Sequence, residues 1–82
     1  MADYIRAHQF SANNRRLLAQ RTQCGCFYCQ RIFHPREITQ WLREGTGTAL
    51  CPYCGIDSVI GEGPELHITP GLLRNMHQHW FG

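Results

Sequence analysis

The stretches that decide the fold are CGCFYC at residues 24–29 and CPYCG at residues 51–55. Each contains a pair of cysteines with two residues between them, Cys26 with Cys29 and Cys51 with Cys54, and 21 residues separate one pair from the other. This spacing lets one tight turn, a knuckle, aim both sulfurs at a single ion, and two knuckles complete a tetrahedral site. The sequence therefore predicts a metal site whose ligands are Cys26, Cys29, Cys51 and Cys54.

The residues around the two pairs also match each other. Tyr28 and Tyr53 each stand directly before the second cysteine, and Gly55 follows the second pair, where a left-handed backbone is often needed. We predict one structural Zn²⁺, because a closed shell of four thiolates leaves no open position for catalysis and contributes folding energy instead. Iron, which also accepts four-sulfur geometry, is the alternative metal.

Cys24 is the fifth cysteine and has no place in the paired pattern. It could replace Cys26 as a ligand, because Cys24 and Cys29 also close a short loop. It could instead be a half-buried free thiol, or a reactive thiol that forms a disulfide on oxidation. The sequence leaves these three interpretations open.

The chain is short enough to need a metal. Its 82 residues form one domain, 1–82, and a chain of this size buries only about 60% of its unfolded surface. Such a core is marginal and usually needs disulfides, a metal or a partner, and an odd number of cysteines fits a disulfide framework poorly. With 43% hydrophobic and 17% charged residues, the composition excludes a multidomain enzyme, a coiled coil and a collagen-like fibre.

Working outward from the cysteines, the chain divides into three parts. They are a basic lead-in at 1–23, the knuckles at 24–61, and a loop with a C-terminal helix at 62–82. The lead-in is predicted to be irregular to residue 10 and helical over 11–22. The knuckle region is predicted to contain strands within 30–33, 46–50 and 56–60. It also has a helix from Pro35 to Gly45, because Ile38, Trp41 and Leu42 follow helical spacing. The last helix begins at Thr69 and Pro70.

These elements predict a small α+β domain that is zinc-ribbon-like, with a Cys₄ site, short antiparallel hairpins and about three short helices. A treble-clef-like relative is the alternative. The two differ in whether Cys51 and Cys54 sit on a hairpin turn or at the start of a helix. Val59 and Ile60, which suit a strand, favour the hairpin.

The charge is unevenly distributed. All eight basic residues are Arg, and residues 1–31 carry a net charge of +4 whereas residues 32–82 carry −2. Four thiolates and one Zn²⁺ would bring the total charge to about zero, so the chain is not a general polyanion binder. Possible contacts with a partner or a nucleic acid are Arg15, Arg16, Arg21, Arg31 and Asp57. The alternatives are a solvated helix face for the arginines and a turn cap at Asp57 and Ser58.

Catalytic patterns are weak. We find no Ser/His/Asp set, no paired carboxylates and no glycine-rich phosphate loop, so we expect a protein that is not an enzyme. His67, Asn75 and His77 loosely follow the His/Asn/His order of small nucleases but lack the usual acidic-His pair, which leaves a metal- or His-dependent hydrolase as a remote alternative. The chain has no signal peptide and no membrane-length apolar run, so we expect a cytoplasmic protein without a membrane partner.

Several motifs together resemble a family of small bacterial cytoplasmic proteins of unassigned function. The most distinctive is CPYCGIDSVIG at residues 51–61. Residues that add to the likeness are Phe33, Pro35, Glu37, Ile38 and Trp41, the lead-in residues His8, Asn14, Arg15 and Leu18, and the ending Met76, Trp80 and Phe81. The resemblance implies a zinc-ribbon-like cytoplasmic protein and carries over no activity.

The functional prediction is a non-enzymatic, zinc-stabilised binding module, an adaptor or regulator that docks a protein partner. The near-neutral charge of the metal-bound form and the small size favour it. The alternative is a nucleic-acid-binding protein that uses the basic first helix on phosphates. Salt dependence would separate them, because phosphate contacts make affinity fall steeply with salt. The sequence does not predict an oligomeric state.

Overall fold

The computed structural model describes residues 3–43, 45–63 and 66–82, and it confirms a small α+β domain with three short helices and two antiparallel sheets. The helices are α1 (Asp3–Ala7), α2 (Arg15–Ala19) and α3 (Pro70–Phe81), with the 3₁₀ turns η1 (His8–Ser11) and η2 (Pro35–Glu37). The strands are β1 (Cys24–Cys26), β2 (Ile32–Phe33), β3 (Trp41–Leu42), β4 (Thr48–Ala49) and β5 (Val59–Gly61).

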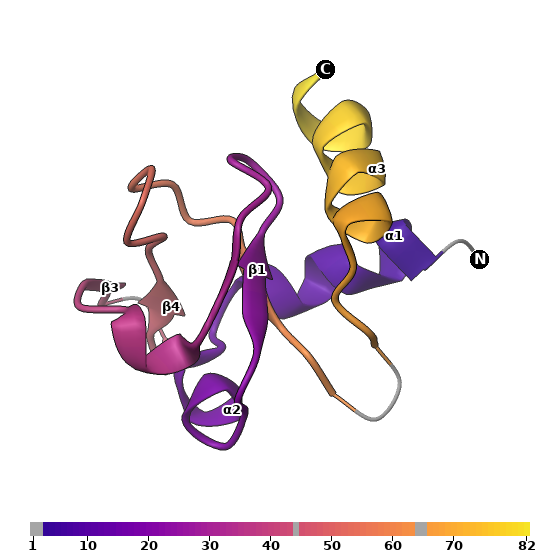
Figure 1. The fold of residues 1–82 in the computed structure, drawn as a ribbon. Coiled ribbons are helices and arrows are strands. Elements are labelled where there is room, and N and C mark those ends of the chain that lie inside the picture. The colour runs from indigo at the N-terminus through magenta and orange to yellow at the C-terminus, as the bar shows by residue number, and fades with distance from the viewer. Residues whose placement is uncertain (1–2, 44, 64–65) are drawn as a thin grey trace.

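A three-stranded sheet with the order β2-β1-β5 forms the centre of the molecule (Figure 1). Strand β1 pairs antiparallel with β2, Cys24 opposite Phe33, and with β5, Cys26 opposite Val59. The first knuckle lies in the turn between β1 and β2. Strands β3 and β4 make a separate two-stranded sheet. The predicted strands within 30–33, 46–50 and 56–60 are thus present, with shorter or slightly shifted bounds.

The two faces of the central sheet serve two different cores. Alternation along the strands sends Cys24, Cys26 and Val59 into a core that also holds Leu18 and the second knuckle. Ile60 points to the other face, where it packs with residues of α3. The metal-binding core and the helix core are therefore separated by one layer of strands.

Gly25 allows α3 to pack directly on the central strand. An added Cβ at Gly25 would lie 2.9 Å from Cδ1 of Leu73, closer than packed atoms normally approach. Leu73 and Met76 of α3 are fully buried against this face. The helix begins as predicted, with the Thr69 hydroxyl accepting a hydrogen bond from the Leu72 N–H at 3.1 Å and Pro70 in the first turn.

The predicted irregular segment 1–10 is wrong over residues 3–10, with residues 1–2 outside the described residues, and the predicted helix 11–22 is confirmed only in part. The chain forms α1 and η1 first, breaks, and is α-helical again only over Arg15–Ala19. The break occurs at Asn13, whose backbone is left-handed at φ +53°. There the Asn13 N–H donates to the Thr48 hydroxyl at 2.9 Å, and its side-chain oxygen accepts from the Thr46 N–H at 3.3 Å. Bonds to a distant loop replace those of a continuous helix.

Asn14 joins the lead-in to both sheets. It is 2% exposed, and its amide group donates to the Phe10 carbonyl at 3.0 Å and the Val59 carbonyl at 2.8 Å. Its side-chain oxygen accepts from the Ala49 N–H at 3.0 Å. One buried amide thus satisfies backbone groups of η1, β4 and β5.

The predicted helix from Pro35 to Gly45 is also wrong. Only the turn η2 forms, closed by a capping box in which the Arg36 N–H donates to Nδ1 of His34 and the His34 N–H donates to the Glu37 carboxylate, both at 3.0 Å. The chain then extends, and Trp41 pairs with Ala49 across β3 and β4. Apolar residues three and four positions apart would share one face of a helix. Here the backbone groups of this segment bond across β3 and β4 instead of within a helix. Gly45, predicted as a helix end, lies in the turn between these strands at φ +57°.

A search of the described residues for a helix both long and apolar enough to span a membrane finds none.

Candidate metal centre

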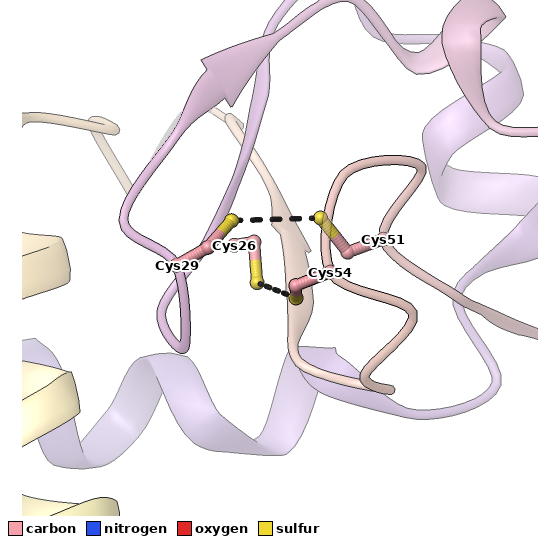
Figure 2. Close-up of side chains that lie close together, drawn as sticks. All are labelled: Cys26, Cys29, Cys51 and Cys54. Carbon is pink, nitrogen blue, oxygen red and sulfur yellow. Dashed lines mark hydrogen bonds between the residues drawn. The ribbon is translucent and has the colours of Figure 1, made fainter.

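The four paired cysteines converge at one point between the central sheet and the second knuckle (Figure 2). Their sulfurs all lie within 4.8 Å of one another. The sulfurs of Cys26 and Cys54 are 3.6 Å apart, as are those of Cys29 and Cys51. A tetrahedral ion with metal–sulfur bonds of about 2.3 Å needs sulfurs about 3.8 Å apart. The cluster therefore fits a four-coordinate metal ion.

The two knuckles are built in the same way. In each, the N–H of the first cysteine donates to the carbonyl five residues later, Cys26 to Arg31 and Cys51 to Ile56, both at 3.0 Å. The N–H of the following tyrosine also points at the first sulfur, at 3.4 Å in both knuckles. This shared closure aims both sulfurs of each pair inward, as the spacing predicts.

Both knuckles need a left-handed residue directly after the second cysteine. Gly55 has φ +79° there and Gln30, at the matching position, has φ +64°. Only Gly55 has the residue type that normally marks such a position. Sequence reasoning therefore identified this turn in the second knuckle and missed it in the first.

The second knuckle sits on a turn and not at the start of a helix. After Cys54 the chain passes through a bend directly into β5, which holds Val59 and Ile60. The helix start is therefore excluded, but the predicted hairpin is not formed either, because the strands that flank this turn do not pair with each other. The strands on either side of the knuckle, β4 and β5, belong to different sheets.

Burial and hydrogen bonds set the protonation of these thiols. Burial raises the pKa of Cys29 to about 11 and that of Cys54 to about 12. Burial also pushes up the pKa of Cys26, but hydrogen bonds from Ser58 and from the knuckle backbone outweigh it, and the pKa is lowered. Four thiols so close together cannot all ionise without a cation among them, so a metal would displace their protons as it binds.

Ser58 is a member of the site that sequence reasoning missed. It is buried, and its hydroxyl lies 3.0 Å from the sulfur of Cys26. Its carbonyl accepts from the Phe27 N–H at 3.0 Å, which ties the first knuckle to β5. The sequence pairs Ser58 with Asp57 as a turn cap and names Asp57 as a possible contact. In the structure Asp57 is exposed whereas Ser58 is buried. The only signal in the sequence for the burial of Ser58 is its position directly before the strand residue Val59.

Cys24 lies outside the four-sulfur cluster. It is fully buried in the strand β1, and its thiol donates to the carbonyl of Phe33 at 3.4 Å. Burial raises its pKa to about 12. The structure therefore brings Cys26, and not Cys24, to the metal position. It places Cys24 deeper than the half-buried thiol we had considered, and burial opposes the reactivity we had weighed.

The four candidate arginines do not form one surface. The Arg15 guanidinium carbon lies 5.2 Å from the Trp41 ring, and that of Arg31 lies 4.7 Å from the Tyr53 ring at the second knuckle. Arg15 and Arg21 border one cleft, whereas Arg16 is simply exposed. The Tyr53 hydroxyl also donates to Glu37, so Arg31 belongs to a cluster at the knuckles and not to the first helix.

An aromatic patch covers the other side of the first knuckle. We define the aromatic patch as the side chains of Tyr28, Phe81, His77, Trp80 and His8. Tyr28 meets Phe81 edge-on with ring centres 4.8 Å apart, and His8 stacks on Trp80 at 3.9 Å. Tyr28, Trp80 and Phe81 are 42%, 39% and 45% exposed. Trp80, near the end of α3, is therefore exposed and not part of the core.

The four cysteines are the only group of three or more potential ligands that could hold a metal ion within the ranges 3–43, 45–63 and 66–82. His77 belongs to the aromatic patch, with Nδ1 3.2 Å from the Phe27 carbonyl, and His67 is exposed. A scan against protein-family models and searches of curated proteins and of solved structures found no match to this chain. The interpretation of the site therefore depends on its own geometry.

Proposed function

We propose that this chain is a non-catalytic interaction module whose fold is held by one structural Zn²⁺ and whose aromatic patch docks a protein partner. The observation that carries the proposal is the four-sulfur cluster with matched knuckles. All four positions of a tetrahedral ion are taken by thiols of the chain, so such an ion would serve the fold and not a reaction. Zinc is favoured over iron because thiolate pairs on two knuckles are typical of structural zinc.

The proposal includes the class of the fold and its setting. Two knuckles on short antiparallel strands support a zinc-ribbon-like classification. The resemblance of residues 51–61 to small bacterial cytoplasmic proteins supports a cytoplasmic location. The zinc-ribbon-like class and the cytoplasmic location are thus both parts of this proposal.

The aromatic patch supports docking of a protein. Exposed aromatic side chains that pack on one another are enriched at the energetic centres of interfaces, because they bury much surface for little lost flexibility. Tyr28 extends from the first knuckle and Phe81 from the end of α3, so the metal site and the helix together set the shape of the patch. Loss of the metal would remove one side of it.

The test is capture of partners by the tagged, zinc-loaded chain from its native cells, with and without nuclease, followed by mass spectrometry. We expect a protein that survives nuclease and that the double variant Tyr28→Ala/Phe81→Ala fails to capture. Ile32→Thr is the matched control, because Ile32 is 40% exposed on β2 and lies outside the patch. Capture that is equal for both variants, or that nuclease abolishes, would contradict the proposal.

A further inference from the structure

A cleft of about 230 Å³ lies between α2, η2 and β3, on a part of the molecule that the aromatic patch does not use. Its polar lining comes from Arg15, Arg21 and Arg36, with His34 and the ring of Trp41. A wider, open hollow of about 720 Å³ adjoins it, shares Arg15 and Trp41, and adds Arg43. We call the two together the arginine groove. Among the described residues that line it, none is acidic.

Arg21 borders this cleft and contributes a positive charge to it. Its Nε is buried, has no hydrogen-bond partner in the described part of the chain and lies, with Nη2, beside Gly63, which does not line the cleft. Arg21 therefore attracts an anionic oxygen in the cleft by its charge and not through that buried N–H. Arg36, from η2, borders the same cleft. The described lining of the groove thus has donors for more than one phosphate and no carboxylate; Glu37, outside the lining, interacts with the charge of Arg36.

Arg15 and Trp41 add a flat surface to these charges. The Arg15 guanidinium sits over the Trp41 ring at 5.2 Å, and the pair separates the cleft from the wider hollow. Aromatic rings and guanidinium planes are the surfaces on which unpaired bases stack. Arginines on both sides of such a platform are the arrangement that a strand of nucleic acid requires, with a base on the platform and phosphates on either side.

We propose that the arginine groove binds single-stranded nucleic acid, with Arg15, Arg21 and Arg36 on phosphates and the Arg15–Trp41 pair beneath a base. A duplex is disfavoured because reading a groove needs a helix of some length, and α2 beside the arginine groove has five residues. The long helix α3 lies at the opposite end of the molecule from α2 (Figure 1). An acidic peptide would meet the arginines but leave the stacking platform unused.

The test is binding of a short fluorescein-labelled oligouridylate to the zinc-loaded full chain, measured by anisotropy over a series of salt concentrations. We expect Arg21→Gln and Arg36→Gln to weaken binding roughly tenfold each, and to reduce the log–log salt slope by about 0.7 per contact. Arg74→Gln is the matched control, with the same charge change at an exposed position on α3, and should leave both values nearly unchanged. In a Trp80→Phe background, the oligonucleotide should quench the fluorescence of Trp41.

Zinc content and circular dichroism of each variant establish that it is folded before binding is compared. Equal loss of affinity in Arg21→Gln and Arg74→Gln would overturn the proposal, because it would show a general charge effect. So would the absence of saturable binding at low salt. Tighter binding of polyglutamate would instead indicate an acidic protein, and binding of inorganic pyrophosphate without the oligonucleotide a small-anion site. These binding measurements do not involve the aromatic patch, which the Tyr28→Ala/Phe81→Ala variant tests separately.

Discussion

At the scale of single residues, two buried polar side chains connect parts of the chain that sequence alone keeps apart. Asn14 holds η1, β4 and β5 together through three hydrogen bonds, and Ser58 links the ligand Cys26 to the start of β5. Both are fully or almost fully buried. Buried polar groups with complete hydrogen bonding specify one arrangement, because any other leaves them unpaired in the core.

Replacing Asn14 by Ala should therefore destabilise the zinc-loaded domain by about 2–4 kcal/mol. The change leaves the Val59 carbonyl and the Ala49 N–H without partners inside the protein. Urea denaturation followed by circular dichroism measures this loss. Asn75→Ala, on the exposed surface of α3, is the control and should change the free energy of unfolding by about 0.5 kcal/mol or less. An equal loss of unfolding free energy in Asn14→Ala and Asn75→Ala would show that the buried hydrogen bonds of Asn14 do not stabilise the domain.

A second prediction for a single residue concerns the pKa of the Tyr53 phenol. The hydrogen bond from its hydroxyl to Glu37 raises the pKa of Tyr53 above 10.0. A raised pKa means that the folded state favours the protonated phenol. This stabilisation is complete below pH 10 and is lost as the pH rises through the folded-state pKa. The same bond lowers the pKa of Glu37.

In the Glu37→Gln variant we expect the pKa of Tyr53 to fall back toward 10. Titration of tyrosinate absorbance measures it, with Tyr53→Phe identifying which of the three tyrosines changes. An unchanged titration in Glu37→Gln would mean that Glu37 does not hold the phenol in solution.

At the scale of elements, the knuckles and α3 follow local rules, whereas the other elements do not. Each knuckle closes through bonds within six residues, so its shape is written into the spacing of its cysteines. Helix α3 has its own cap and its own apolar side. Strands β3 and β4, two residues each, have no stability alone and form only because the rest of the fold brings them together.

Removing the metal should unfold the domain. The short strands cannot order the knuckles unaided, and binding energy at such sites is folding energy. Cys51→Ser should lose zinc and its cooperative thermal transition, whereas Cys24→Ala, the matched cysteine control, should keep one zinc per chain. Metal analysis and circular dichroism with and without a chelator check both. A chelated protein with unchanged melting would refute the structural role of the metal.

At the scale of the whole molecule, the three surfaces that could carry function occupy different places. The metal cluster lies between the two knuckles, the aromatic patch at the end of α3, and the arginine groove beside α2. The net charge of the chain is +2, and four thiolates with one Zn²⁺ would bring it to about zero, so no global field favours one kind of partner. Specific binding must therefore come from the local arrangement of Tyr28 and Phe81 or of Arg21 and Arg36.

The two cysteine pairs that form the four-sulfur cluster, the α+β class, the C-terminal helix and the strand character of Val59 and Ile60 could be predicted from the sequence alone. Each depends on residues close together in the chain. Two residues between cysteines suffice to make a knuckle, and a capping threonine followed by proline suffices to start a helix. Local geometry favours these features, and tertiary packing then stabilises them.

Only the tertiary structure decided the rest. The break at Asn13, the strand at Trp41 and the burial of Ser58 all depend on partners more than 30 residues away in the chain, or on the pairing of β3 with β4. Helical spacing at Ile38, Trp41 and Leu42 was misleading, because periodicity reports which side chains are apolar and not where their backbone bonds go. In a chain this small, long-range hydrogen bonds outweigh local propensity, since no single element is stable alone.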